Sequence, residues 1–281
     1  MDHWVYDTFT LYDHDYRNSD YIQILSKKNY RIFGNWACLY GEDLQSPLDA
    51  TTRLIILGGS TTSALLESTW TYHFYHQLLG TIPSLAVFNG GCGNYNSFCE
   101  FMKLNRDIST IKPTHVISLS GVNDTVLAPI LSNGFASFLV KPLTQGQLFS
   151  RFNDEIPIVK RSMRWIEESV HMKSICSNYN SHFMRFLQPC LASPSNPVET
   201  MSPQLLKMMS SVRKVFSADY DQLVSQFYSD VQSSSLPTFV DDISHVLPND
   251  DSLWRDSRHP TDQGYMIIAK EVLEKIKPAL L

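Results

Sequence analysis

Two residues near the end of the chain have the types and the spacing of a general base and its orienting carboxylate. In "RDSRHPTDQGY", residues 255–265, Asp256 precedes His259 by three positions. A histidine can take a proton from a hydroxyl near neutral pH when a carboxylate on its other ring nitrogen fixes its tautomer. A tight turn would fold Asp256 back onto the ring, and Pro260 favours a helix that starts just after it. The alternative is a surface turn that caps this helix.

A serine that could act as a nucleophile follows an apolar run in the first third of the chain. The run "RLIIL", residues 53–57, is ended by Gly58 and Gly59, and Ser60 comes next. A continuous apolar run fits a strand buried on both faces, and side chains after such a strand face the ligand crevice of α/β proteins. A turn or capping role is the alternative. The Gly-x-Ser-x-Gly elbow is absent, because Thr62 stands where its last glycine would be.

Two more segments combine strand ends with groups that could bind an anion. "NGGCGNYNS", residues 89–97, has three glycines that let backbone amides turn toward a negative charge. It lacks the Gly-Lys-Ser/Thr and the Gly-x-Gly-x-x-Gly spacing of nucleotide loops. "SLSGVNDT", residues 118–125, contains Asn123, which could cap a turn or donate its amide N–H to an oxyanion.

The apolar pattern between these segments alternates between strands and helices. Strands are predicted at 53–57, 85–88, 115–119 and 237–240, and helices near 70–80, 98–108, 156–174, 203–232 and 261–276. Such alternation predicts a parallel sheet with right-handed crossovers. We expect one domain over residues 1–281, with 1–50 as an aromatic-rich amino-terminal extension and about 126–235 as a helical insertion or cap. The aromatic residues of the extension are explained by core or edge packing, with a sugar-stacking surface as the alternative.

Composition narrows the function classes. The chain of 281 residues is 43% hydrophobic and 18% charged with a net charge of −5, which is typical of a soluble globular protein and argues against nucleic-acid binding. Five cysteines without a Cys-x-x-Cys pair, and His73 and His76 without ligand partners at a recognisable spacing, indicate no metal site. No signal peptide or membrane span is apparent, so a cytoplasmic location is expected. No cofactor is expected, and the oligomeric state is left open.

Together the segments "GGST", "NGGCGN", "GVND" and "DSRHP" resemble the four sequence blocks of the SGNH hydrolases, the GDSL-type esterases and lipases. The resemblance implies a flavodoxin-like three-layer α/β/α sandwich with a central parallel sheet. It also implies that Ser60 is the nucleophile and that Asp256 orients the base His259. The oxyanion hole would consist of the Ser60 backbone N–H together with Gly93 and Asn123.

This chain departs from the family pattern in two blocks. The first reads Gly-Gly-Ser-Thr where the name-giving pattern has Gly-Asp-Ser-Leu. The second is a looser match, so that Asn94 or Gly91 are alternatives to Gly93 as the amide donor.

The function expected from these residues is serine-dependent hydrolysis of an acyl ester through an acyl-enzyme. The preferred substrate is a glycan carrying O-acetyl groups, with a small-molecule ester as the broader class. One alternative is an O-acyltransferase with the same triad. The other is a non-catalytic carbohydrate-binding protein on the same scaffold, since a fold alone does not determine function.

Overall fold

The computed structural model describes residues 4–7, 11–14, 16, 18–66, 68–125, 158–215 and 218–280. Its strands are β1 (Trp4–Asp7), β2 (Leu11–His14), β3 (Arg31–Phe33), β4 (Trp36–Tyr40), β5 (Thr52–Gly58), β6 (Leu85–Asn89), β7 (His115–Ser120), β8 (His182–Leu187) and β9 (Val240–Asp242). Its α-helices are α1 (Ser19–Ser26), α2 (Trp70–Leu78), α3 (Ser97–Ile111), α7 (Ile158–Asn178), α8 (Pro203–Val215), α9 (Tyr220–Ser233) and α10 (Asp262–Leu280).

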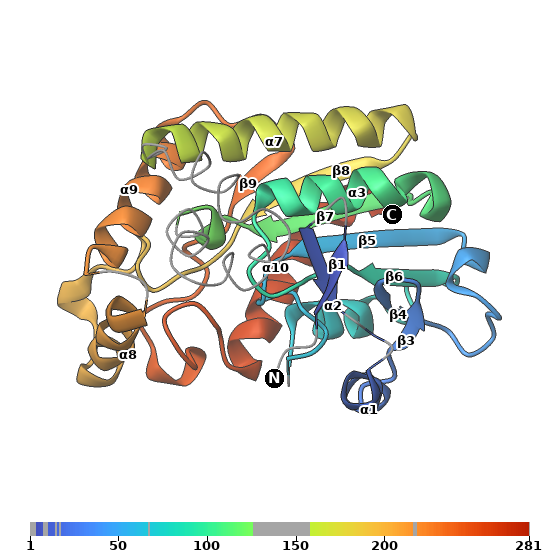
Figure 1. Cartoon of the computed structure of the whole chain (residues 1–281), viewed down its shortest axis with the longest axis horizontal. Helices are drawn as coiled ribbons and strands as arrows, with labels where there is room; N and C mark the ends of the chain where they lie inside the picture. Colours follow the sequence, from blue (N-terminus) through green and yellow to red (C-terminus); the bar gives the residue numbers. More distant parts are fainter. Residues whose placement is uncertain are drawn as a thin grey trace.

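Parallel pairing joins β6, β5, β7, β8 and β9 in that spatial order (Figure 1). In chain order this arrangement reads second, first, third, fourth and fifth, which is the flavodoxin-like order. The winding reverses between β5 and β7, so the loops after these two strands border the crevice where such folds bind ligands. A parallel sheet was expected, but two of the strand pairs are antiparallel: β4 with β6, and β3 with β4. Strands β1 and β2 form a separate antiparallel pair.

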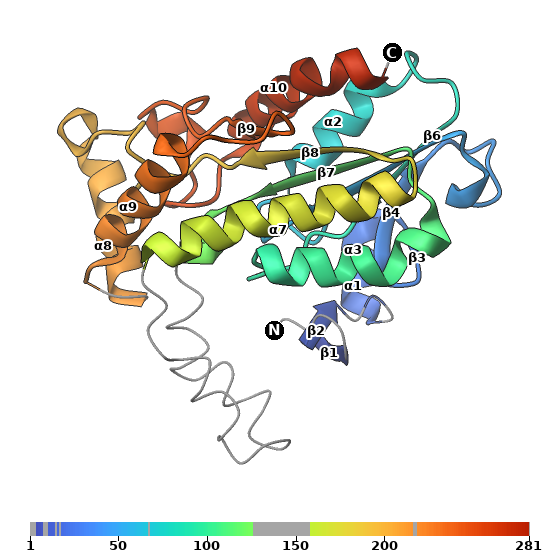
Figure 2. The ribbon, with the colours of Figure 1, turned by 90° about the horizontal axis from the view of Figure 1, so that it is seen from above.

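Helices cover both faces of the sheet, which confirms the predicted three-layer sandwich. Helices α2 and α10 pack together on one face, and α3 and α7 on the other (Figure 2). Leu54 and Ile56 of β5 belong to the apolar core on the α2 face, whereas Ile55 and Leu57 belong to the core on the α3 face. All four side chains are fully buried, which explains why this strand is apolar at every one of these positions.

Each predicted strand and helix has a counterpart in the structure. Strands β1, β2, β3, β4 and β8 and helix α1 were not predicted. The last parallel strand, β9, covers 240–242 instead of 237–240. The helical stretch 203–232 is divided into α8 and α9.

The predicted extension and insertion overlap the sandwich itself. Strands β3 and β4, within 1–50, extend the central sheet, and β8, within 126–235, is hydrogen-bonded between β7 and β9. Helices α8 and α9 lie beyond the carboxyl ends of β7 and β8 (Figure 1) and are the described part of the range 126–235 that lies outside the three layers. Residues 126–157 are outside the described residues, and the division into core, extension and insertion stays a prediction.

Core packing accounts for several aromatic residues of the first forty positions. Tyr16, Tyr21, Tyr30 and Trp36 are each at most 5% exposed, so none of them offers a surface for stacking a sugar. The side chains of four other residues lie outside the described part of the chain: Trp4, Tyr6, Phe9 and Tyr12. Among the helices that the structure describes, none is both long and apolar enough to cross a membrane.

Candidate active site

Ser60 lies in a tight turn directly after β5, as predicted. Two backbone hydrogen bonds close this turn, from Thr62 N to Gly59 O (3.1 Å) and from Ser63 N to Ser60 O (3.2 Å). A Cβ atom at Gly58 would lie 2.6 Å from the carbonyl oxygen of Leu119 on the neighbouring strand β7. Only glycine therefore lets β5 end this close to β7, and this close approach fixes where the serine turn begins.

The structure brings Ser60, His259 and Asp256 into one hydrogen-bonded chain. Ser60 Oγ lies 2.7 Å from His259 Nε2, and His259 Nδ1 lies 2.8 Å from Asp256 Oδ2 and 3.0 Å from Oδ1. When Nδ1–H donates to the carboxylate, Nε2 is left as an acceptor for the serine hydroxyl. These distances are in the hydrogen-bonding range required of a nucleophile, its base and the group that orients the base.

The Asp256 carboxylate is stabilised in its charged form. Burial alone would raise its pKa, but the hydrogen bond and charge of His259, together with two backbone N–H groups, lower the pKa to about 2. The two N–H groups are those of Arg258 and His259, which donate to Oδ1 over 2.9 and 3.0 Å. Asp256 is therefore ionised near neutral pH and can hold the imidazole in one tautomer and orientation.

The turn that carries Asp256 and His259 is fixed by neighbouring backbone. Arg255 N donates to His259 O over 2.9 Å, and Leu191 N donates to Ser257 O over 3.0 Å. Helix α10 begins just after this turn, at the position expected from Pro260. A Cβ at Gly264 would lie 2.7 Å from Pro260 Cβ and from the carbonyl oxygen of Leu253, so this glycine allows α10 to pack closely against the turn.

Asn123 lies in the helical residues 122–125, which follow β7 after Gly121. Its Nδ2 donates one hydrogen bond to Tyr95 O over 2.9 Å, which fixes the amide orientation while the group retains a second N–H. A Cβ at Gly59 would lie 2.5 Å from the same Nδ2 atom. The side-chain amide of Asn123 thus lies against the residue that precedes Ser60, on the side of the crevice formed by β7.

The glycine-rich loop after β6 lies at the same edge of the sheet. Cys92 N donates to Gly58 O over 3.2 Å, which ties the loop to the end of β5. The N–H of Gly91 donates to Asn89 Oδ1 over 2.9 Å and is thus engaged within the loop, which disfavours Gly91 as an oxyanion donor. Asn94 has a left-handed backbone conformation, with φ 64°. Gly93, which lies between Cys92 and Asn94, stays the predicted donor.

Two polar side chains that the sequence analysis left without a role hold the serine turn. Asn89 Nδ2 donates to Thr62 O over 2.8 Å, and Trp70 Nε1 donates to Thr62 Oγ1 over 3.1 Å. Thr62 is fully buried, and a Cβ at Gly91 would lie 2.8 Å from Thr62 Cβ. Thr62, which stands where a Gly-x-Ser-x-Gly elbow would have its last glycine, thus accepts a hydrogen bond from Trp70 and packs against Gly91. The position of Asn89 directly after an apolar run is the signal that could have identified it.

A buried polar network lies beneath the β7 end of the site. Asp124 Oδ1 accepts from the backbone N–H of Ser97, the first residue of α3, over 3.0 Å. Farther along, Glu100 Oε2 lies 3.7 Å from an Arg185 guanidinium nitrogen, and both side chains are fully buried. Burial raises the pKa of Glu100 to about 7, although Arg185 acts in the opposite direction. The network joins α3 to the strand ends, and none of its members was predicted from sequence.

His14 is a buried histidine next to the serine turn. Its Nε2 lies 3.3 Å from Ser63 Oγ, and the residue is only 4% exposed. Burial lowers its pKa from 6.5 to about 4, Asp13 acts in the opposite direction, and Lys103 lowers it further.

This pKa shift predicts a loss of stability in acid. Between about pH 6.5 and pH 4 the unfolded chain binds a proton at His14 that the folded protein does not bind. The contribution of His14 is therefore complete above pH 6.5 and lost as the pH falls toward 4, by up to about 3 kcal/mol. Urea unfolding of wild type and His14→Phe at pH 7 and pH 4.5 measures the free energy of unfolding that each protein loses over this interval. The variant should lose less stability than wild type over that interval, and equal losses would contradict the assignment.

His73 and His76, which the sequence analysis considered as metal ligands, lie on α2. His73 Nε2 lies 2.7 Å from Asp262 Oδ1, so the carboxylate partner that the sequence did not reveal comes from the first turn of α10. Ser68 also hydrogen-bonds Asp262. His76 has a lowered pKa because of burial, with His73 lowering it further. In the described part of the chain, no three histidine, cysteine or acidic side chains are grouped so that they could hold a metal ion.

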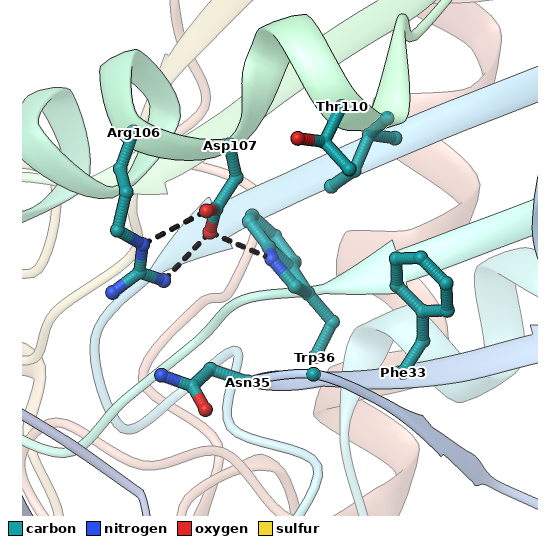
Figure 3. Close-up of a pocket in the computed structure, with 8 residues that line it drawn as sticks. Phe33, Asn35, Trp36, Arg106, Asp107 and Thr110 are labelled. Atoms are coloured by element: carbon teal, nitrogen blue, oxygen red, sulfur yellow. Dashed lines mark hydrogen bonds and ion pairs between the residues drawn. The ribbon is translucent and has the colours of Figure 1, made fainter.

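A cavity of about 310 Å³ lies between the β3–β4 turn and α3 and contains no residue of the predicted triad (Figure 3). Two charged side chains that line it, those of Arg106 and Asp107, form an ion pair. Asp107 accepts from Trp36 Nε1 over 2.9 Å and from two nitrogens of Arg106 over 2.8 and 2.6 Å (Figure 3). Since the carboxylate and the guanidinium form an ion pair with each other, nothing among the described residues of this cavity indicates a charged ligand.

No protein-family model matches this chain, and no curated protein matches it. Solved structures that resemble it include a lipase/acylhydrolase from Enterococcus faecalis, with 16% identity, 82% of this chain and 97% of that chain covered, and a TM-score of 0.48. A GDSL-like lipase from Bacteroides thetaiotaomicron has 13% identity, and the match covers 81% of this chain and 89% of that chain with a TM-score of 0.44. An acetyl xylan esterase from Geobacillus stearothermophilus has 16% identity, and the match covers 81% of this chain and 95% of that chain with a TM-score of 0.41. These are likenesses of fold, so the activity is inferred below from this chain's own residues.

Proposed function

We propose that this protein is a serine-dependent acyl-ester hydrolase of the SGNH type. The observation that supports it most directly is the hydrogen-bonded chain from Ser60 Oγ through His259 to an ionised Asp256. Ser60 follows β5, one of the two strands between which the winding of the sheet reverses, and the turn before α10 brings His259 and Asp256 to it.

In the first half of the reaction, His259 Nε2 takes the proton of Ser60 as Oγ bonds to the ester carbonyl carbon. The Asp256 carboxylate stabilises the imidazolium that forms. When the tetrahedral intermediate collapses, the bond to the leaving oxygen breaks, and His259 gives its proton to that oxygen. The alcohol departs, and the acyl group stays on Ser60.

In the second half, water replaces the alcohol. His259 takes a proton from the water as its oxygen bonds to the acyl carbon, and then returns the proton to Ser60 Oγ as the carboxylic acid leaves. In both halves, negative charge develops on the carbonyl oxygen. We assign its stabilisation to the backbone N–H groups of Ser60 and Gly93 and to the second N–H of Asn123.

The oxyanion role predicts a specific defect for Asn123→Ala. Loss of one donor should lower kcat by ~10²–10³-fold, with KM changed little, because the donor acts most strongly on the charge of the transition state. Steady-state kinetics on the purified variant measure both constants. Because Asn123 also bonds Tyr95 O, a melting curve accompanies the kinetics. A defect confined to KM would contradict this role.

Hydrolysis of p-nitrophenyl acetate by the purified protein tests the proposed function. Release of nitrophenol that depends on Ser60 supports a hydrolase, and its absence with every ester tried would favour the non-catalytic binding protein. Adding an alcohol or sugar acceptor separates the remaining alternative, since an O-acyltransferase forms an acylated acceptor at the expense of free acid.

Within ester hydrolysis, we propose a glycan O-acetyl group as the substrate. The proposal rests on the family resemblance of the sequence blocks. Comparing kcat/KM for p-nitrophenyl acetate, butyrate and octanoate, and acetate release from acetylated xylo-oligosaccharides, tests it. A preference for the octanoate ester together with no acetate release from the sugars would refute the substrate class while leaving the reaction type intact.

A further inference from the structure

The described residues among 13–30, which are 13, 14, 16 and 18–30 and are called here the amino-terminal brace, direct two polar side chains at the segment that carries Ser60. His14 Nε2 lies 3.3 Å from Ser63 Oγ, and Lys28 Nζ donates to Ala64 O over 3.1 Å. Both contacts are long-range in sequence, and both fall on the segment between β5 and α2. None of the four sequence blocks discussed above includes the brace.

Apolar contacts would be enough to attach the brace to the sandwich. Tyr16, Tyr21 and Leu25 are each at most 5% exposed and belong to the core that covers the α2 face of the sheet. Burying the polar atoms of His14 adds a desolvation cost that such an attachment does not require. Both polar contacts fall on the segment that contains and follows the serine turn, so they constrain the position of that turn.

A buried ion pair fixes the brace in one place. Asp13 lies 2.7 and 2.9 Å from Lys103 Nζ on α3, and both side chains are at most 1% exposed. Lys103 Nζ also donates to Asn35 O over 3.0 Å. Sliding of the brace would separate two charges in a dry environment, which is strongly unfavourable. His14, the next residue, is therefore held at a fixed place relative to α3.

We propose that His14 and Lys28 of the amino-terminal brace are positioning residues of the active site. His14 and Lys28 hold Ser63 and Ala64, and the hydrogen bond from Ser63 N to Ser60 O passes that constraint to Ser60. The brace thereby sets the direction of Ser60 Oγ toward His259. The inference rests on the proposed ester-hydrolase function, and both brace side chains act through the turn without touching the reacting atoms.

Four variants of the full chain test the proposal with p-nitrophenyl acetate. Reactive sites are counted by labelling Ser60 to completion with a fluorophosphonate, so that kcat refers to folded enzyme. The double variant His14→Phe/Lys28→Met should lose ~10- to 100-fold in kcat with KM within about twofold of wild type, because small displacements of a reacting group cost rate more than affinity. His14→Phe alone should show part of this loss, and His14→Gln should recover it, since the amide again offers a polar atom to Ser63.

The matched control is Asn18→Ala. Asn18 caps α1 through a 2.9 Å bond from Asp20 N, so its loss destabilises the same segment by a comparable route but leaves both contacts to the turn in place. It should lower the melting temperature without lowering kcat. Wild-type kcat in the double variant, or an equal kcat loss in Asn18→Ala, would overturn the positioning role alone. A wild-type protein without Ser60-dependent hydrolysis would overturn the proposed function, and the positioning role with it.

Discussion

Ser60→Ala is expected to lose about a million-fold in kcat for ester hydrolysis while its melting temperature stays near that of wild type. In the proposed mechanism the Oγ atom forms the bond to the substrate carbon, and alanine removes the hydroxyl that hydrogen-bonds His259 Nε2. Because the members of a triad act as a unit, His259→Ala should be impaired by a similar factor. Initial rates at high enzyme concentration measure the residual activity, and a fluorophosphonate probe measures the reactivity of the serine.

Ser211→Ala is a suitable control. Ser211 lies exposed on α8 and bonds only locally, to Lys207 O, in the described structure. This variant should keep full activity and full labelling. Persistent labelling and activity in Ser60→Ala would refute the nucleophile assignment, and near-normal turnover of a folded His259→Ala protein would refute the triad as a whole.

Asp256→Asn should lower kcat by ~10⁴-fold, less than the loss of serine or histidine. The Asp256 Oδ1 atom accepts backbone N–H bonds from Arg258 and His259. An asparagine would keep its oxygen at those two donors and turn its NH₂ group toward His259 Nδ1. Nδ1 would then have to be the acceptor, the proton would sit on Nε2, and the imidazole could no longer take a proton from Ser60.

The kinetic result and the melting temperature together distinguish this tautomer effect from a structural one. If Asp256 were only a capping residue, its replacement would cost about 1 kcal/mol of stability and leave turnover unchanged. A folded Asp256→Asn protein with wild-type kcat would therefore refute its orienting role.

The local sequence pattern predicted the parallel sheet and the strand ends at which the candidate site lies, and the resemblance of the four sequence blocks implied the three-layer sandwich. Apolar runs followed by Ser60 and by Asn123 mark parallel strands whose ends lie at one edge of a sheet. Asp256 and His259 are close in sequence, so that a short turn could be expected to join them. What the structure adds is contact over long sequence separations, such as that between Ser60 and His259.

Elements with polar residues in buried positions were not predictable. Strand β8 has Arg185 in its centre, and this residue interrupted the apolar run that would have marked a strand. The guanidinium is fully buried beside Glu100 and donates to Ser120 Oγ over 2.8 Å. The partners that neutralise a buried charge come from strands and helices distant in sequence. The local residue pattern of β8 therefore does not reveal them. The same reason explains why the roles of His14 and Asn89 were missed.

The close approach of Gly59 to Asn123 has a consequence for engineering the protein by consensus. The name-giving family pattern has aspartate at the position of Gly59, and a design that restored common residues would introduce it here. Its Cβ would lie 2.5 Å from Asn123 Nδ2 and 3.3 Å from the carbonyl oxygen of Tyr95. The two positions, 64 residues apart in sequence, are thus in contact, and an aspartate at position 59 would require the Asn123 side chain, and with it the proposed oxyanion donor, to shift.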